Sequence, residues 1–499
     1  MKKETCEIWK SALIGVVALL TLVCWLQFQP LLPDVKPKEK IGHKLLENFV
    51  TPSQMTRIEF SRIDSTSGKL CRLVLVKDRE TWRLPALFNF PAENAEQVAK
   101  IVAPLIQLSI LDVVDESVAK VNISKIEQFH RECGLLNPSQ IDENFETFSL
   151  PLKSPKDVKV TTTSNTFSPN ISNGVALHVK IEGENGEILV NLLIGNRLPE
   201  SSTTRDTRFV RFLNDDVVYT VDFSGDTTQG NGSTEIMEFT DRISFNPIDW
   251  VDRDLLRISR WDVLYLIIRD YTFSLVQSTA TDSEIQKANV HQGGTAVFKQ
   301  NSENVLSRVW SLAKFFTYEG SVLSEKVDES PESTNNNVLN AIIDVLSSLK
   351  IVDVRRKTDV LVSLFRNGQF GSELVSQSSI LGNFGFNFFD YDPLDPDKIA
   401  PQLAGEGGTY ELVAKNGVHI ILVFGKKIDD KRVCLVYALF DSDVLKESVT
   451  DDSEVNFLEQ DSVKKVELKN KRFSEWFYLV SEVDYQKIRF NLSEITNEQ

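Results

Sequence analysis

Histidine and cysteine are the residues from which a metal site or a catalytic thiolate would be built, and the chain has five of each. His130 and Cys133 stand close together in "FHRECGLL", a spacing that places both on one face of a helix. Such a pair could bind a metal ion or activate the thiol. Two ligands make an incomplete site, however, and the same stretch is typical of a plain helix end, so we assign no site to it.

Acidic residues gather in "DYDPLDPD", where hard oxygen ligands suggest a calcium loop. They are Asp390, Asp392, Asp395 and Asp397. The pattern of a calcium loop fails in detail, because Leu394 occupies the fifth position and Pro401 the twelfth. The prolines favour a turn-rich surface loop.

The motifs of common enzyme classes are absent from the sequence. There is no G-x-x-x-x-G-K-[ST], H-E-x-x-H, C-x-x-C or G-x-S-x-G, and "GEGGTYEL" at residues 405–412 lacks the lysine and helix of a phosphate loop. Carboxylate pairs cannot be chosen among 71 acidic residues. We therefore predict no catalytic, cofactor-binding or metal-binding residue and no cofactor.

Charge and cysteine usage narrow the partners and the redox chemistry. The formal net charge is −16, and an acidic surface repels phosphate, so we expect no nucleic-acid partner. Cys71, Cys133 and Cys434 are the cysteines after residue 33, and their odd number and wide spacing give no disulfide framework. We expect them to be small buried apolar residues, with a single bridge as the alternative.

Residues 12–26, "ALIGVVALLTLVCWL", carry no charge and predict a short transmembrane helix that anchors the chain in a membrane. A cleaved signal peptide is the alternative, but the following "CWLQFQPLLP" contains no Ala-x-Ala cleavage pattern. Lysines flank the segment on both sides and do not decide its orientation. Because such anchors most often lead a translocated domain, we place the large C-terminal part outside the cytoplasm.

The same pattern of residues occurs twice, 241 positions apart. "QVAKIVAPLIQLSILDV" and "VLNAIIDVLSSLKIVDV" each predict an amphipathic helix that leads into a strand, with Asp112 and Asp353 at equivalent positions. Each half also has an Asn-Gly hairpin, at Asn185 and at Asn416, whose second strand ends in an apolar residue and glycine. The front of the second half, "RWDVLYLIIRDYTFSLVQS", is interpreted as a pair of strands.

We therefore expect an α+β protein of two tandem homologous modules, each a mainly antiparallel sheet with a covering helix, after one N-terminal transmembrane helix. The predicted boundaries are 1–33 for the cytoplasmic tail and anchor, 34–50 for a stalk, 51–257 for the first module, 258–323 for strands that open the second module, 324–337 for a polar loop and 338–499 for the remainder of the second module.

Several short motifs resemble a bacterial family. They are Trp82-x-Leu84, Pro91-Ala92-Glu93, "CGLLNP" at 133–138, "LLIGN" at 192–196 and "VVYTV" at 217–221. The chain is similar to the domain-of-unknown-function family numbered forty-three forty, in the two-module form of planctomycete-like bacteria. The resemblance covers residues 50–270 and, more loosely, 330–490, and its motifs are structural.

The resemblance implies membrane-anchored proteins often encoded beside ABC transporters of the gliding-motility type. We therefore expect a non-enzymatic, single-pass protein of the bacterial cytoplasmic membrane, with its large part extracytoplasmic and with ABC transporter subunits as partners. An envelope enzyme whose site is assembled from distant residues and a structural spacer are the two alternatives.

Overall fold

The computed structural model describes residues 37–47, 49, 51–92, 95–114, 123–143, 174–199, 205–224, 238–276, 287–301, 309–319, 322–326, 334–389, 401–448, 452–489 and 495. Within these residues no helix combines the length and the apolar character needed to cross a membrane. The segment 12–26 that the sequence analysis assigns to a membrane anchor lies outside the described residues.

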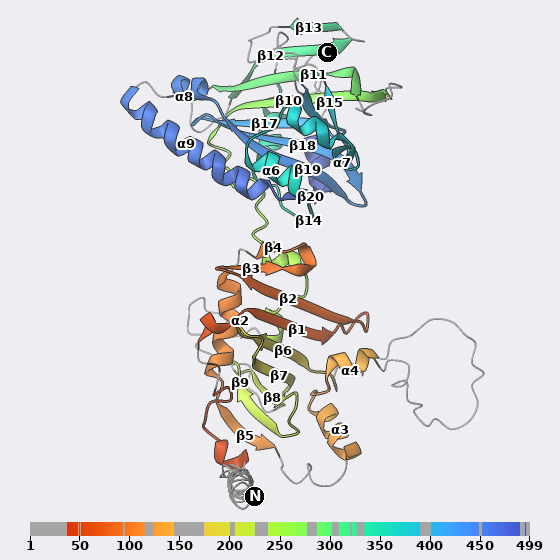
Figure 1. Ribbon diagram of the computed structural model, residues 1–499, viewed down its shortest axis with the longest axis vertical. Coiled ribbons are helices and arrows are strands. Elements are labelled where there is room, and N and C mark those ends of the chain that lie inside the picture. Colours follow the sequence, from red (N-terminus) through yellow and green to blue (C-terminus); the bar gives the residue numbers. More distant parts are fainter. Residues whose placement is uncertain are drawn as a thin grey trace, which may run out of the picture. The chain divides into compact units, whose positions relative to one another are not determined.

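A first sheet has nine strands in the order β4-β3-β2-β1-β6-β7-β8-β9-β5 (Figure 1). Its strands are β1 (Arg57–Ile63), β2 (Leu70–Asp78), β3 (Thr81–Leu84), β4 (Phe90–Ala92), β5 (Ile110–Val114), β6 (Leu177–Glu182), β7 (Ile188–Arg197), β8 (Thr207–Phe212) and β9 (Val218–Asp222). The helices of this part are α2 (Ala95–Gln107), α3 (Ile123–Glu132) and α4 (Pro138–Glu143). The pairs β1–β6, β6–β7, β7–β8, β8–β9 and β9–β5 are all antiparallel.

A second sheet of eleven strands contains the order β13-β12-β11-β10-β17-β18-β19-β20-β14, with β15 and β16 attached beside it. Its strands are β10 (Val263–Val276), β11 (Lys287–Asn301), β12 (Val309–Glu319), β13 (Val322–Lys326), β14 (Asp353–Arg356), β15 (Phe386–Phe389), β16 (Gln402–Gly405), β17 (Thr409–Ala414), β18 (Val418–Ile428), β19 (Lys431–Phe440) and β20 (Trp476–Ser481). The helices here are α5 (Asn336–Ser347), α6 (Asp359–Arg366), α7 (Ser378–Gly382), α8 (Ser442–Ser448), α9 (Asp452–Phe473) and α10 (Glu482–Ile488).

The two nine-strand orders correspond strand for strand, with β1 in the place of β10, β6 in that of β17 and β5 in that of β14. The sheets are mainly antiparallel and carry helices, which confirms the α+β class. One prediction is wrong: "VLYLIIRDYTFSLV" is not a strand pair but the single strand β10. The stretch contains no Gly, Pro or Asn to end a strand, and its pairing with β11 runs from Tyr265 to Val276 with one register shift, between Thr272 and Phe273.

The predicted amphipathic helices are α2 and α5, and their apolar stripes form the core. The buried residues of the stripes are Val98, Ile101, Val102, Leu105 and Leu108 in the first copy and Leu339, Ile342, Ile343, Leu346 and Leu349 in the second. At the exits, Asp112 Oδ1 accepts a hydrogen bond of 2.8 Å from the next backbone N–H, and Asp353 Oδ1 does the same at 2.8 Å. The predicted equivalence of these aspartates is therefore visible in their hydrogen bonds.

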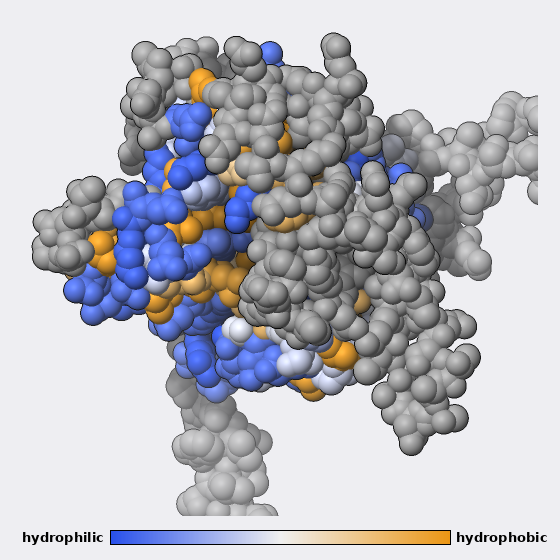
Figure 2. All heavy atoms as spheres, turned by 90° about the horizontal axis from the view of Figure 1, so that it is seen from above, coloured by the Kyte–Doolittle hydropathy of each residue, from blue (hydrophilic) through white to orange (hydrophobic). Residues whose placement is uncertain are grey.

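The entry into each sheet repeats as well. In the first copy the backbone hydrogen bonds run from Leu45 N to Leu108 O at 2.8 Å and from Ile110 N to His43 O at 2.9 Å. In the second copy the corresponding bonds run from Leu255 N to Leu349 O at 3.0 Å and from Ile351 N to Arg253 O at 2.8 Å. Packing divides the chain into two compact units, residues 1–72 with 98–243 and residues 73–97 with 244–499. Figure 2 shows hydrophilic residues interspersed with hydrophobic ones on the visible face.

Candidate functional site

The pair His130 and Cys133 is part of the packing of α3. His130 Nε2 lies 3.1 Å from the carbonyl oxygen of Asp216, and Cys133 belongs to an apolar cluster with Leu135 and Leu193. Burial lowers the pKa of His130 and raises the pKa of Cys133 to about 11. A neutral imidazole and a protonated thiol do not make an activated nucleophile.

Metal chemistry finds no support in the part of the chain that the structure describes. No group of three or more His, Cys, Asp and Glu side chains there could hold a metal ion. The four aspartates of "DYDPLDPD" lie outside the described residues. The cysteines Cys133 and Cys434 are buried and Cys71 is half-buried, and each is a free thiol.

The motifs that carry the family resemblance meet in space for a structural reason. The backbone N–H of Asn196 donates to the carbonyl of Cys133 at 2.9 Å, which joins "LLIGN" to "CGLLNP". A Cβ on Gly195 would stand 2.3 Å from that carbonyl oxygen, so only glycine fits. In the second unit a Cβ on Gly425 would stand 2.2 Å from the carbonyl oxygen of Phe384, which is the same contact.

The glycines of "GEGGTYEL" form a tight connection between β16 and β17. The Gly407 N–H donates to the Phe424 carbonyl at 2.7 Å, and the Tyr485 hydroxyl donates to the Gly407 carbonyl at 2.9 Å. Gly408 has φ +82°, and a Cβ there would stand 2.9 Å from the carbonyl oxygen of Arg269. These backbone groups are occupied by the protein itself, which is the opposite of a phosphate-binding loop.

A cavity of about 410 Å³ lies in the unit formed by residues 73–97 and 244–499. Its lining residues are Val76, Asp78, Arg83, Phe88, Asn89, Arg356, Glu475 and Trp476. The volume is in the range of small-ligand sites, and the wall combines aromatic rings with charged groups of both signs. Among the described residues, this cavity is our candidate for a binding site.

One wall of the cavity is a strained turn between β3 and β4, at the end of the 3-10 helix η3 (Pro85–Leu87). Phe88 and Asn89 both have left-handed backbones, with φ of 56° and 66°. Such a conformation costs about 1 to 2 kcal/mol for a residue other than glycine. Hydrogen bonds hold it, from Asn89 N to Leu84 O at 2.9 Å and from Arg83 to Asn89 O at 3.1 Å. The turn leaves the Phe88 ring 46% exposed at the wall.

The two carboxylates of the cavity each contact a guanidinium. Asp78 accepts from Arg83 at 2.8 Å, and Glu475 accepts from Arg366 at 3.0 Å. Arg356 is half exposed and stands 3.7 Å from the carboxylate of Asp359, which is beyond hydrogen-bonding distance. The Arg356 guanidinium can therefore donate to a ligand at little cost.

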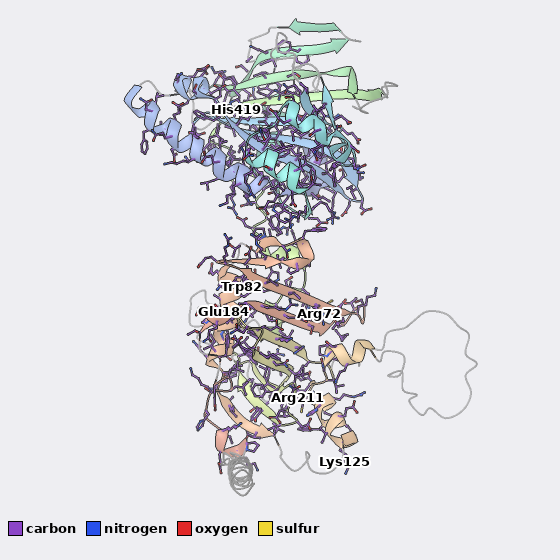
Figure 3. The ribbon with its side chains drawn as sticks, in the orientation of Figure 1. Arg72, Trp82, Lys125, Glu184, Arg211 and His419 are labelled. Carbon is purple, nitrogen blue, oxygen red and sulfur yellow. The ribbon has the colours of Figure 1, made fainter. Side chains whose placement is uncertain are left out.

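A second polar cluster lies on the face of the second sheet, around His419 (Figure 3). Glu411 is buried and accepts from His419 Nδ1 at 2.6 Å and from Arg269 at 2.8 Å. Burial raises the pKa of Glu411, but Arg269 and His419 outweigh it and lower that pKa to about 2. The ionised Glu411 thereby fixes His419 with Nε2 directed to Asp441, 3.9 Å away.

Sequence reasoning predicted no site residue, and it did not find the cavity of about 410 Å³. Trp82, which it did single out, lies on β3, pairs with Ala92 of β4 and is not one of the lining residues. Arg356 at the end of β14 and Glu475 in the turn before β20 lie far along the chain, and no short motif marks them. The one local signal was the positively charged stretch "DVRRK" at residues 353–357, which the sequence pattern indicated only as a strand.

Comparison with known proteins gives one match. A family model described as a domain of unknown function, DUF4340, matches residues 82–363, more than half of the chain. No curated protein and no solved structure matches. The match begins in β3 and ends in α6, so it includes Arg83, Phe88, Asn89 and Arg356 of the cavity wall. The chain therefore belongs to the family of domain of unknown function DUF4340.

Proposed function

We propose that this protein is a non-enzymatic, membrane-anchored binding protein of the bacterial cell envelope that serves as an accessory partner of an ABC-type transport system. Its large part is extracytoplasmic and consists of two homologous modules. The apolar segment 12–26 supports the anchor, and the identical strand order of the two sheets supports a duplication. The resemblance to a family whose members are often encoded beside ABC transporters supports the transport partner.

The observation that carries the binding role is the cavity of about 410 Å³ beside the strained Phe88–Asn89 turn. Strain of this kind is kept where the geometry has a use, and here it holds an aromatic ring in the wall of a charged cavity. Arg356 supplies guanidinium donors that suit carboxylate or carbonyl groups of a partner. An aromatic ring next to an arginine is the composition of an interface anchor point.

One feature favours recognition over catalysis, and a second favours it over a plain spacer. Asp78 and Glu475 each have a guanidinium partner, at 2.8 Å and 3.0 Å, so neither carboxylate is placed as a general acid. A plain spacer, the other alternative, would need no cavity of this size. The proposal therefore ranks a binding protein above both.

A photoreactive amino acid in place of Phe88 tests the role of the cavity in native membranes. The control position is Ile188, which is 55% exposed on β7. We expect transporter subunits to be crosslinked from position 88 and not from position 188, and Arg356→Ala to reduce the yield. Equal yields from both positions would remove the cavity from the partner interface.

A further inference from the structure

Helix α9 has one face packed on the protein and one face without a covering element among the described residues. Its inner face buries Val455, Ser462, Asn470 and Phe473. Asn470 binds both backbone groups of Ala438 on β19, by 2.8 Å and 2.9 Å hydrogen bonds. Figure 1 shows α9 on the outside of the second sheet, with its far side directed to solvent.

The outer face carries the two most exposed large apolar side chains of the described residues. Phe457 is 73% and Leu468 is 67% exposed. Eleven positions separate them, which is close to three helical turns, so both lie on one stripe. A single exposed apolar residue needs no explanation, but two aligned on one helix mark an interaction surface.

The stripe has the spacing of a coiled-coil seam. From Phe457 the positions continue through Asp461, Lys464 and Leu468 to Lys471, in alternating steps of four and three residues. Asp461 and Lys464 are charged, and they sit between the two apolar positions. This stripe, Phe457–Asp461–Lys464–Leu468–Lys471, is here called the α9 seam.

The α9 seam is complementary to itself when two copies run antiparallel. Centred between positions 462 and 463, such a pair places Phe457 opposite Leu468 and Asp461 opposite Lys464, each contact occurring twice. A parallel pair would instead set Asp461 against Asp461 and Lys464 against Lys464, which is repulsive. Antiparallel helix dipoles add to the preference.

We propose that the protein self-associates through antiparallel pairing of α9 with α9 of a second copy, in a two-fold symmetric dimer. In a two-fold symmetric interface each contact occurs twice, so Phe457 of either copy contacts Leu468 of the other. Asp461 already has Lys465 at 2.7 Å within the helix, so Lys464 of the other copy joins an existing ion pair. The apolar contacts supply affinity and the charges fix direction.

Disulfide trapping tests this pairing in the full-length protein in detergent. The background has Ser in place of Cys6, Cys24 and Cys71, and it keeps the buried Cys133 and Cys434. Phe457→Cys and Leu468→Cys are prepared separately and then mixed. We expect a disulfide-linked dimer in the mixture and not in either variant alone, because like positions would be about 16 Å apart in an antiparallel pair.

Charge reversal provides a second readout, measured as the dissociation constant of the dimer by analytical ultracentrifugation. We expect Asp461→Lys to weaken association at least tenfold, and the further change Lys464→Asp in the same chain to restore it. Both positions are exposed or half-exposed, so circular dichroism should show unchanged folding. A monomer at all concentrations, crosslinks in the single variants, or trapping of another protein instead would overturn the proposal.

Discussion

The buried amine of Lys357 gives the sharpest prediction about stability. The side chain is 2% exposed, and its Nζ donates to the Phe473 carbonyl at 2.8 Å and lies 4.0 Å from the centre of the Phe365 ring. Burial lowers the pKa of Lys357 from 10.5 to about 7. The folded state therefore resists the protonated form that the unfolded chain prefers.

The sign follows from proton binding. Between pH of about 7 and 10.5 the unfolded chain holds one more proton at this site than the folded chain, so the unfolding free energy rises with pH by about 1.4 kcal/mol per unit. The destabilisation is fully present below pH 7. It is about 5 kcal/mol there, because the pKa of Lys357 is 10.5 in the unfolded chain and about 7 in the folded chain. It fades as the pH approaches 10.5.

Lys357→Met removes this cost and also the hydrogen bond to Phe473, which is worth about 1 to 2 kcal/mol. We expect the variant to be more stable than the natural protein by about 3 kcal/mol at pH 7 and nearly equal at pH 9.5. The control is Lys415→Met, which makes the same charge change at an exposed position. Its effect should not depend on pH in this way.

The assay is urea unfolding at each pH, followed by pulsed hydrogen exchange and mass spectrometry of peptides from β14 and β20. These peptides report on the second unit, which matters because a chain of two units does not unfold in one step. A Lys357→Met effect that stays constant from pH 7 to pH 9.5, or a variant less stable at pH 7, would refute the reasoning.

Three further outcomes follow from the contacts. Arg208→Met should destabilise the first unit by about 3 to 5 kcal/mol in urea unfolding, because it leaves the buried Asp206 carboxylate, 2.7 Å away, without its cation. Glu411→Gln should make the free energy of unfolding, measured by urea unfolding, fall less steeply as the pH is lowered from 4.5 to about 2. The reason is that the stabilisation from a carboxylate with a pKa of about 2 is present above pH 4.5 and lost as the pH falls toward 2. Gly195→Ala should lower the melting temperature, because its Cβ would meet the Cys133 carbonyl at 2.3 Å.

Local signals in the sequence were enough for much of the fold. Asn-Gly at 185–186 and at 416–417 predicted two hairpins, and both glycines have φ of +74°. The apolar stripes of α2 and α5 predicted two buried helices. The 241-residue offset anticipated the shared strand order because it joined a helix to the strand that follows it.

Other elements gave no usable signal. Helix α9 escaped notice because Phe457 and Leu468 face away from the core, so apolar residues occur on both sides and the 3.6-residue pattern is blurred. The cavity was out of reach because Phe88 and Glu475 are almost 400 positions apart. Only tertiary pairing of β14 with β20 brings Arg356 beside Trp476.

The accessory role is tested most directly by crosslinking in native membranes, followed by affinity purification through a C-terminal tag and mass spectrometry. The account predicts that membrane subunits of an ABC transporter are recovered with the protein, and that Arg356→Ala lowers their yield. Reproducible absence of these subunits, while the protein itself is intact in the membrane, would contradict the proposed function and bring the enzyme and spacer alternatives forward.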